Sequence, residues 1–230
     1  MTSSFNGFPE ESLTFFRNLQ ENNTKAWFEA NQESYLRYVR EPALAFIQEL
    51  GPRLAQISNV MVDVRTNGSG TLLRVNRDTR FSKNKDPYKT NVSGLFWDGV
   101  GKKMEASAFG FQLSADKLEL MAGMFQFTKP MLEAYRKAVT DETLGAELLT
   151  IVSKLQDEYR LEGKHYKKVP AGFDAHPERA ELLLYKGLYA FPEPITGEVL
   201  YKAELIDLCM NHFEAMAPLQ TWLDKVKRNT

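Results

Sequence analysis

The sequence has few of the residues that would mark a disulfide, a metal site or a membrane segment. Cys209 is the only cysteine, so the chain cannot form an internal disulfide. The three histidines, His165, His176 and His212, do not follow the spacing of a metal-binding motif, so we predict no metal site and no cofactor. No apolar run approaches the roughly 20 residues that cross a bilayer, and the first residues lack the basic start and apolar run of a signal peptide. These absences make a cytoplasmic location without membrane partners the expectation.

The sequence also lacks the short motifs of several large enzyme classes. It contains no Walker loop, nucleophile elbow or dinucleotide-binding fingerprint, which lowers the odds for those classes without excluding an enzyme with an unfamiliar site. What is present is ordinary for a soluble globular protein: 230 residues, of which 43% are hydrophobic and 26% charged. A net charge of −1 argues against a surface that is basic throughout, although it is compatible with a local basic patch.

Hydrophobic periodicity predicts an α+β fold with a largely antiparallel sheet. Apolar residues at helical spacing predict N-terminal helices over residues 9–57, and Gly51-Pro52 predicts a break or kink in the last of them. Alternation of buried-type and exposed-type residues over 60–64 is typical of a strand with one buried face. Further short alternating runs extend this pattern, so we expect a meander of neighbouring strands over roughly residues 60–124.

The second half of the chain predicts mainly helices, over residues 129–228. Asp141 is placed to cap one of these helices, and Pro218 is expected to separate a late helix from a closing one. Residues 160–177 are rich in glycine and proline and are expected to be irregular. Because no repeat, low-complexity segment or linker divides the sequence, we predict a single domain, residues 1–230, with N-terminal and C-terminal helices covering the sheet.

One segment, residues 72–92, concentrates positive charge. Between residues 74 and 89 six basic residues stand against Asp78 and Asp86, so this stretch carries +4 and the rest of the chain −5. Arginine and lysine recognise phosphates and carboxylates, and neighbouring hydroxyl groups and a tyrosine ring add donors and a stacking surface. The candidate ligand-binding residues are Arg74, Arg77, Arg80, Ser82, Lys83, Lys85, Tyr88 and Lys89.

This segment allows three interpretations. In the first, it binds an anionic ligand, either a phosphate-bearing small molecule or a nucleic acid, and binding weakens with salt. In the second, the chain is an enzyme acting on a phosphate- or carboxylate-bearing substrate, with Asp78 as the candidate general base. In the third, the chain is a structural or interaction protein in which Asp78 is an internal clamp on the neighbouring arginines. The loop is then expected to be hinged at Pro87 and anchored to the core by Phe81 and Tyr88.

The most specific motif of the chain is Arg77-Asp78-Thr79-Arg80-Phe81-Ser82-Lys83, followed by Lys85 and then Pro87-Tyr88-Lys89-Thr90. It resembles the central motif of a family of conserved hypothetical proteins, the domain of unknown function 2461. Other shared motifs are Phe15-Phe16, Asn22-Asn23, Trp27-Phe28, Pro170-Ala171-Gly172-Phe173-Asp174 and His176-Pro177-Glu178. The resemblance covers nearly the whole chain. It implies no established activity, cofactor or catalytic residue, so it leaves the function open.

Overall fold

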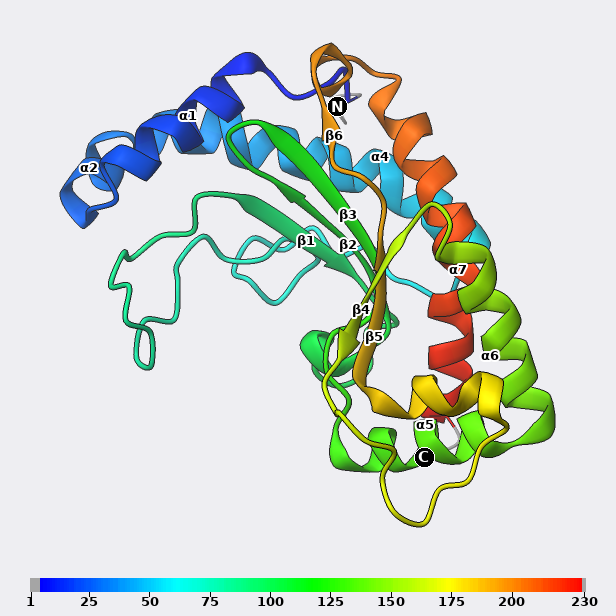
Figure 1. The fold of residues 1–230 in the computed structure, drawn as a ribbon. Coiled ribbons are helices and arrows are strands. Elements are labelled where there is room, and N and C mark those ends of the chain that lie inside the picture. Colours follow the sequence, from blue (N-terminus) through cyan, green and yellow to red (C-terminus); the bar gives the residue numbers. More distant parts are fainter. Residues whose placement is uncertain (1–4, 229–230) are drawn as a thin grey trace.

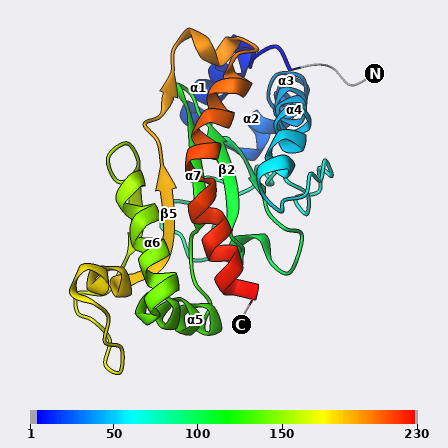
Figure 2. The ribbon, with the colours of Figure 1, turned by 90° about the vertical axis from the view of Figure 1, so that its right-hand side faces the viewer.

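The computed structural model describes residues 5–228 and confirms the α+β fold. Within these residues one six-stranded antiparallel sheet has the strand order β1-β2-β3-β5-β4, with β6 paired to β3. Helices cover one face of the sheet and leave much of the other face open (Figures 1 and 2). The strands are Val92–Phe96 (β1), Ala108–Leu113 (β2), Lys117–Met124 (β3), Arg160–Lys164 (β4), Tyr185–Phe191 (β5) and Ile195–Thr196 (β6).

Helices precede and follow the central strands. The structure confirms Asp141 as a cap, because its carboxylate accepts hydrogen bonds from the backbone N–H groups of Thr143 (2.9 Å) and Leu144 (2.7 Å). Thr24 caps an N-terminal helix in the same way, through the N–H of Trp27 (3.2 Å). The α-helices are Glu10–Glu21 (α1), Lys25–Ala30 (α2), Gln32–Tyr35 (α3), Glu41–Ile57 (α4), Lys129–Thr140 (α5), Glu142–Leu155 (α6) and Leu205–Arg228 (α7). Shorter helical turns are Leu36–Arg40 (η1, a π-helix) and the 3-10 helices Lys103–Glu105 (η2), Pro177–Leu184 (η3) and Glu198–Tyr201 (η4).

Two helices continue through prolines that were predicted to interrupt them. Helix α4 runs through Pro52, and α7 runs through Pro218. A proline inside a helix removes one backbone hydrogen bond from the carbonyl group four residues earlier. Both prolines are exposed, as are Gln48 and Glu214 at those earlier positions, so water can reach the released carbonyl groups. The predicted break at Gly51-Pro52 and the predicted separation at Pro218 are therefore wrong, while a kink at Gly51-Pro52 stays a prediction.

The segment before β1 is not a regular part of the sheet, so the predicted meander begins near residue 92 rather than 60. Residues 60–64 and 72–75 form no named strand, although they lie along the edge of β1. Isolated hydrogen bonds hold them there, including Met61 N–H to Trp97 C=O and Leu73 N–H to Ser93 C=O, both 2.9 Å. The predicted alternation is not kept, because Val64 is 43% exposed while Asp63 is buried, and too few hydrogen bonds form here for a ladder.

Strand β4 lies inside the segment that was predicted to be irregular. It pairs with β5, and its register shifts between Glu162 and Lys164. Gly163 supplies the shift: its φ is +105°, and a Cβ there would lie 2.1 Å from the carbonyl oxygen of Gly187. The short, charged sequence of β4 has little of the apolar alternation that identifies strands, so pairing with β5 determines its conformation.

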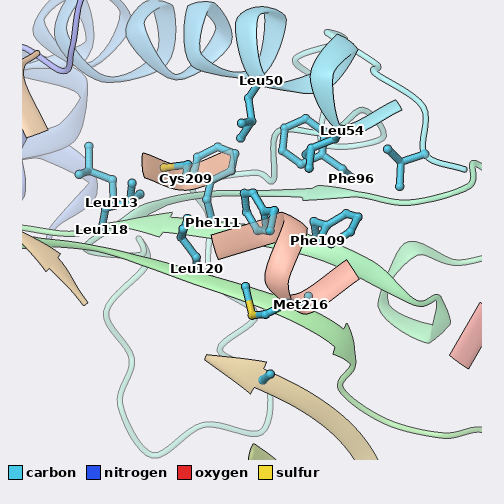
Figure 3. Close-up of a cluster of buried hydrophobic side chains, with 14 of the residues drawn as sticks. Leu50, Leu54, Phe96, Phe109, Phe111, Leu113, Leu118, Leu120, Cys209 and Met216 are labelled. Carbon is cyan, nitrogen blue, oxygen red and sulfur yellow. The ribbon is translucent and has the colours of Figure 1, made fainter. Parts of the chain in front are cut away.

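The core lies between the sheet and the covering helices. Phe111 of β2 contacts Phe46 of α4 with ring centroids 5.0 Å apart, and Phe109 contacts Phe213 of α7 at 5.2 Å. Strand β2 therefore packs against both α4 and α7. Cys209 of α7 is fully buried in this layer, as expected for a core cysteine, and burial raises the pKa of its thiol. The side chains drawn in Figure 3 include Leu50, Leu54, Phe96, Phe109, Phe111, Leu113, Leu118, Leu120, Cys209 and Met216.

The open face of the sheet carries its own, smaller apolar cluster, formed by Leu95, Trp97, Ala106, Ala108 and Met121. These side chains alternate with those that point into the main core, as the two faces of a strand require. None of the helices in residues 5–228 is both long enough and apolar enough to cross a membrane.

Candidate functional site

The basic segment forms a hairpin that leads into β1. Backbone hydrogen bonds join Lys89 N–H to Val75 C=O (2.8 Å) and Arg77 N–H to Pro87 C=O (2.9 Å), with Asn76 paired to Tyr88 between them. We call residues 74–89 the basic hairpin. Figure 1 shows the loop before β1 projecting away from the sheet at the left of the view. Most of its charges therefore lie on a projection rather than inside a cleft.

The base of the basic hairpin is anchored to the N-terminal helices, as predicted for Tyr88. The Asn23 side chain donates to the Tyr88 carbonyl (3.0 Å) and accepts from the Tyr88 N–H (3.1 Å). The Tyr88 ring stacks on Phe28 of α2 at 4.0 Å with an interplanar angle of 14°. Because Tyr88 is buried by this stacking, its ring serves the fold. The contacts also give a structural reason for the Asn22-Asn23 and Trp27-Phe28 motifs.

Phe81 does not anchor the loop, contrary to the prediction. It lies at the hairpin tip and is 96% exposed. The guanidinium carbon of Arg80 lies 5.9 Å from its ring centroid, which is an intraloop contact and not a contact with the core. The hairpin carries its tip away from the apolar layers, so Phe81 has no core surface within reach.

Among residues 5–228, Asp78 forms an ion pair with Arg80 and with no other cation. Nε and Nη2 of Arg80 donate to the two carboxylate oxygens at 2.9 and 2.6 Å, and the side chains of Arg80 and Asp78 are 77% and 43% exposed. These hydrogen bonds lower the pKa of Asp78 from 3.8 to about 2. The pair is thus a local surface contact rather than a buried clamp. A carboxylate with so low a pKa is a weak proton acceptor near neutral pH.

The other charged side chains of the basic hairpin make few hydrogen bonds or ion pairs with the rest of the described protein. Arg77 lies 3.8 Å from the Asp86 carboxylate and 3.4 Å from Ser82 Oγ, and Lys85 donates to the Thr79 carbonyl (3.0 Å). Arg77 and Arg80 thus bind different carboxylates and do not converge. The exposed side chains of Arg74 and Lys83 make no hydrogen bond or ion pair within residues 5–228.

A cavity of about 550 Å³ lies on the open face of the sheet, next to the base of the hairpin. Of the predicted ligand-binding residues only Lys89 lines it. Burial lowers the pKa of Lys89, and the nearby charge of Arg74 lowers it further. The sequence predictions missed the other polar residues of this cavity: Asn91, Ser93, Gln112, Glu119, Arg160, Glu162 and Tyr189. They come from strands far apart in the sequence, so only the pairing of the strands brings them together. The register that places Gln112 opposite Glu119 is one example.

The histidines and the cysteine belong to no metal-binding group in the described part of the chain. No group of three His, Cys, Asp or Glu side chains among residues 5–228 is arranged to hold a metal ion. His212 Nδ1 lies 3.2 Å from the Tyr159 hydroxyl, and burial lowers the pKa of His212. His165 lies beside Tyr166, and His176 lies 3.5 Å from the Glu178 carboxylate at the surface.

Comparison with known proteins gives a family but no activity. A search of curated proteins finds no match to the chain. A family model described as conserved hypothetical protein (DUF2461) matches residues 11–222, from α1 into α7. The match includes the hairpin, all six strands and most of the covering helices. The chain therefore belongs to the DUF2461 family of conserved hypothetical proteins.

Proposed function

We propose that the chain binds an anionic ligand through the basic hairpin, and that single-stranded nucleic acid is the ligand class that fits this surface. One observation carries the proposal: a fully exposed aromatic ring, Phe81, stands among exposed basic side chains on a projecting hairpin. Exposed aromatic rings stack on nucleic-acid bases, while lysine and arginine contact the phosphates between them. The exposed cations near the tip are Arg80, Lys83 and Lys85.

The shape of the hairpin favours an extended polyanion over a small phosphorylated molecule. A small ligand needs a concave site that buries most of its surface. The cavity on the open face is lined by Lys89 but by none of residues 74–86. The other cations are spread along the projection, and all but the half-buried Arg77 face solvent, which suits a ligand that carries several phosphates in a row.

Binding is tested by fluorescence anisotropy with a labelled single-stranded oligonucleotide at increasing salt. For about three phosphate contacts, the slope of log K against log salt is about −2. The double variant Lys83→Gln/Lys85→Gln removes two contacts and reduces the magnitude of that slope by about 1.4. The control is Lys154→Gln/Lys168→Gln, which removes two exposed lysines on α6 and in the 165–176 loop and leaves the slope unchanged.

The contribution of the Phe81 ring to oligonucleotide binding is tested separately. Phe81→Ala removes the stacking surface and weakens binding by about five- to a hundredfold, with little change in the salt slope. Val169→Ala, which truncates another exposed apolar residue, is the matched control. The proposal is wrong if the protein does not bind at low salt, or if the Lys83/Lys85 variant binds as the original chain does.

A further inference from the structure

We propose that the cavity on the open face is a second binding site, which takes a small organic anion with an apolar body. Its volume of about 550 Å³ lies within the range of roughly 300–1,000 Å³ that small-molecule sites occupy. This site is distinct from the hairpin tip, because Lys89 at the base of the hairpin is the only one of residues 74–89 that lines it.

The floor of the cavity is apolar. Leu95 of β1 and Met121 of β3 approach each other across Gly110 of β2. A Cβ at Gly110 would lie 2.9 Å from side-chain atoms of both, so glycine permits the close approach that forms the floor. Tyr189 and Phe191 of β5 add an aromatic wall, with their rings edge to face at 5.5 Å. A flat aromatic or branched aliphatic group fits such a surface.

The charges that line the cavity leave one cation unpaired. Glu119 accepts hydrogen bonds from Lys117 (2.9 Å) and Gln112 (3.2 Å). Arg160 pairs with Glu162 at 2.7 Å. The Lys89 ammonium has no hydrogen bond and no carboxylate partner among residues 5–228. An unpaired, half-buried ammonium in an otherwise balanced cavity selects for a ligand that carries negative charge.

The surroundings of Lys89 strengthen this preference. Burial removes water from its ammonium, and the positive charges of Arg74 and Lys103 act on it as well. A carboxylate or phosphate placed there replaces the lost hydration and relieves the repulsion among the cations. The ligand's acid group therefore lies at Lys89, and its apolar body extends over Leu95 and Met121.

Asn91 adds a second requirement for the ligand. Its side-chain oxygen is buried and has no hydrogen-bond donor in the described part of the chain, although Asn91 lines the same cavity. A buried amide oxygen without a partner is unfavourable. A ligand with a hydroxyl or N–H group near its acid group satisfies this oxygen once the Asn91 amide turns towards the cavity, so a hydroxy acid or an N-acylated acid matches the site better than a simple acid.

The charge preference is tested with phenyl phosphate and mandelate, an aromatic hydroxy acid, against the neutral benzyl alcohol. Binding is followed by NMR chemical shifts at concentrations up to about 10 mM, since ligands of this size bind in the millimolar range. We expect both anions to shift the resonances of β1 and β3 and to bind more tightly than benzyl alcohol. Lys89→Met keeps most of the side-chain volume and weakens anion binding by about ten- to a hundredfold. The Lys154→Met control leaves binding unchanged.

A second variant tests the location without touching a charge. Ser93→Phe places a ring in the cavity from β1 and abolishes binding of the anions and of the neutral analogue alike. Circular dichroism checks that both variants remain folded. The inference is overturned if neither anion binds, if Lys89→Met binds them as the original chain does, or if Ser93→Phe leaves binding intact. Neither variant alters Phe81, Lys83 or Lys85, so oligonucleotide binding at the tip is judged independently.

Discussion

At the scale of single residues, Asp78 shows how a local contact can look like a catalytic or core feature in the sequence. Its position between two arginines suggested a base or a buried clamp, but it makes a bidentate pair with Arg80 at the surface. The pair is too exposed to stabilise the core. The same carboxylate competes with an anionic ligand for Arg80, so it moderates the charge of the hairpin tip.

The first prediction concerns the pKa of Asp78. Because the hydrogen bonds from Arg80 are the main cause of the shift, Arg80→Gln raises the pKa of Asp78 from about 2 towards 3.8. The pKa is measured by carbon NMR of the side-chain carboxyl group during an acid titration. Arg74→Gln is the matched control and has a smaller effect, since the charge of Arg74 contributes less than the hydrogen bonds from Arg80 to the lowered pKa of Asp78.

The lowered pKa of Asp78 determines how the stability of the hairpin changes with pH. The ion pair stabilises the hairpin fully above pH 3.8, and this contribution is lost as the pH falls from 3.8 towards 2. Arg80→Gln should therefore reduce the acid sensitivity of the hairpin backbone over that interval. A pKa of Asp78 that stays near 2 in Arg80→Gln would contradict the assignment of the shift to Arg80.

The sequence identified some of the candidate residues and missed others for physical reasons. Lys89 and the charged hairpin follow from local charge density, which is a property of the sequence alone. Asn91 and Glu119 gave no such signal, because their place in the cavity depends on strand pairing and on which face of the sheet is left uncovered. Phe81 was assigned to the core because aromatic residues are usually buried, but it lies at the end of a projection.

At the scale of elements, the basic hairpin depends on a contact with the N-terminal helices. The Asn23 side chain makes hydrogen bonds with both the N–H and the C=O of Tyr88, as a neighbouring strand would. The stack of Tyr88 on Phe28 adds apolar burial to this polar contact. Helices that are remote in the sequence thus fix the direction in which the hairpin leaves the sheet.

The second prediction removes this anchor. Asn23→Ala leaves the N–H and C=O of Tyr88 without partners and destabilises the fold by about 1–3 kcal/mol. Hydrogen exchange should accelerate over residues 75–89 more than in the core strands β2 and β3. Asn22→Ala is the neighbouring control, because the Asn22 side chain donates to the Asn18 carbonyl at the exposed end of α1 and makes no hydrogen bond with the hairpin in the described part of the chain. Equal effects of the two substitutions would show that Asn23 does not anchor the hairpin.

Element boundaries were less predictable from the sequence than element types. The helices and central strands followed hydrophobic periodicity, whereas the errors fell where tertiary contacts decide the outcome. Pro52 and Pro218 are tolerated because they lie on solvent-facing sides of α4 and α7. β4 forms because β5 offers it an open edge, and residues 60–64 stay irregular because they lie along β1 without a full ladder.

At the scale of the whole molecule, one buried residue, Gln220, links the two helical halves to the sheet through its side chain and its backbone. Gln220 of α7 accepts a hydrogen bond from Ser58 at the end of α4 (2.6 Å). Its backbone carbonyl accepts one from Ser107, next to β2 (2.9 Å). Apolar contacts of α7 with α4 and the sheet surround these bonds. The N-terminal helices, the sheet and the C-terminal helices therefore share one interface.

This shared interface predicts that the chain unfolds as one cooperative unit. The single-domain prediction covered residues 1–230, of which 1–4 and 229–230 lie outside the described residues. Trp27 in α2, Trp97 beyond β1 and Trp222 in α7 report from three parts of the molecule. In variants that keep one tryptophan each, the midpoint of the fluorescence transition should coincide with the midpoint of the circular dichroism transition of the same variant. Gln220→Ala removes the side-chain bond to Ser58 but keeps the backbone carbonyl that accepts from Ser107, and in each single-tryptophan background it should lower the stability by the same amount, about 1–3 kcal/mol. A tryptophan that unfolds at its own midpoint within one variant, apart from the circular dichroism signal, would divide the chain into separate domains.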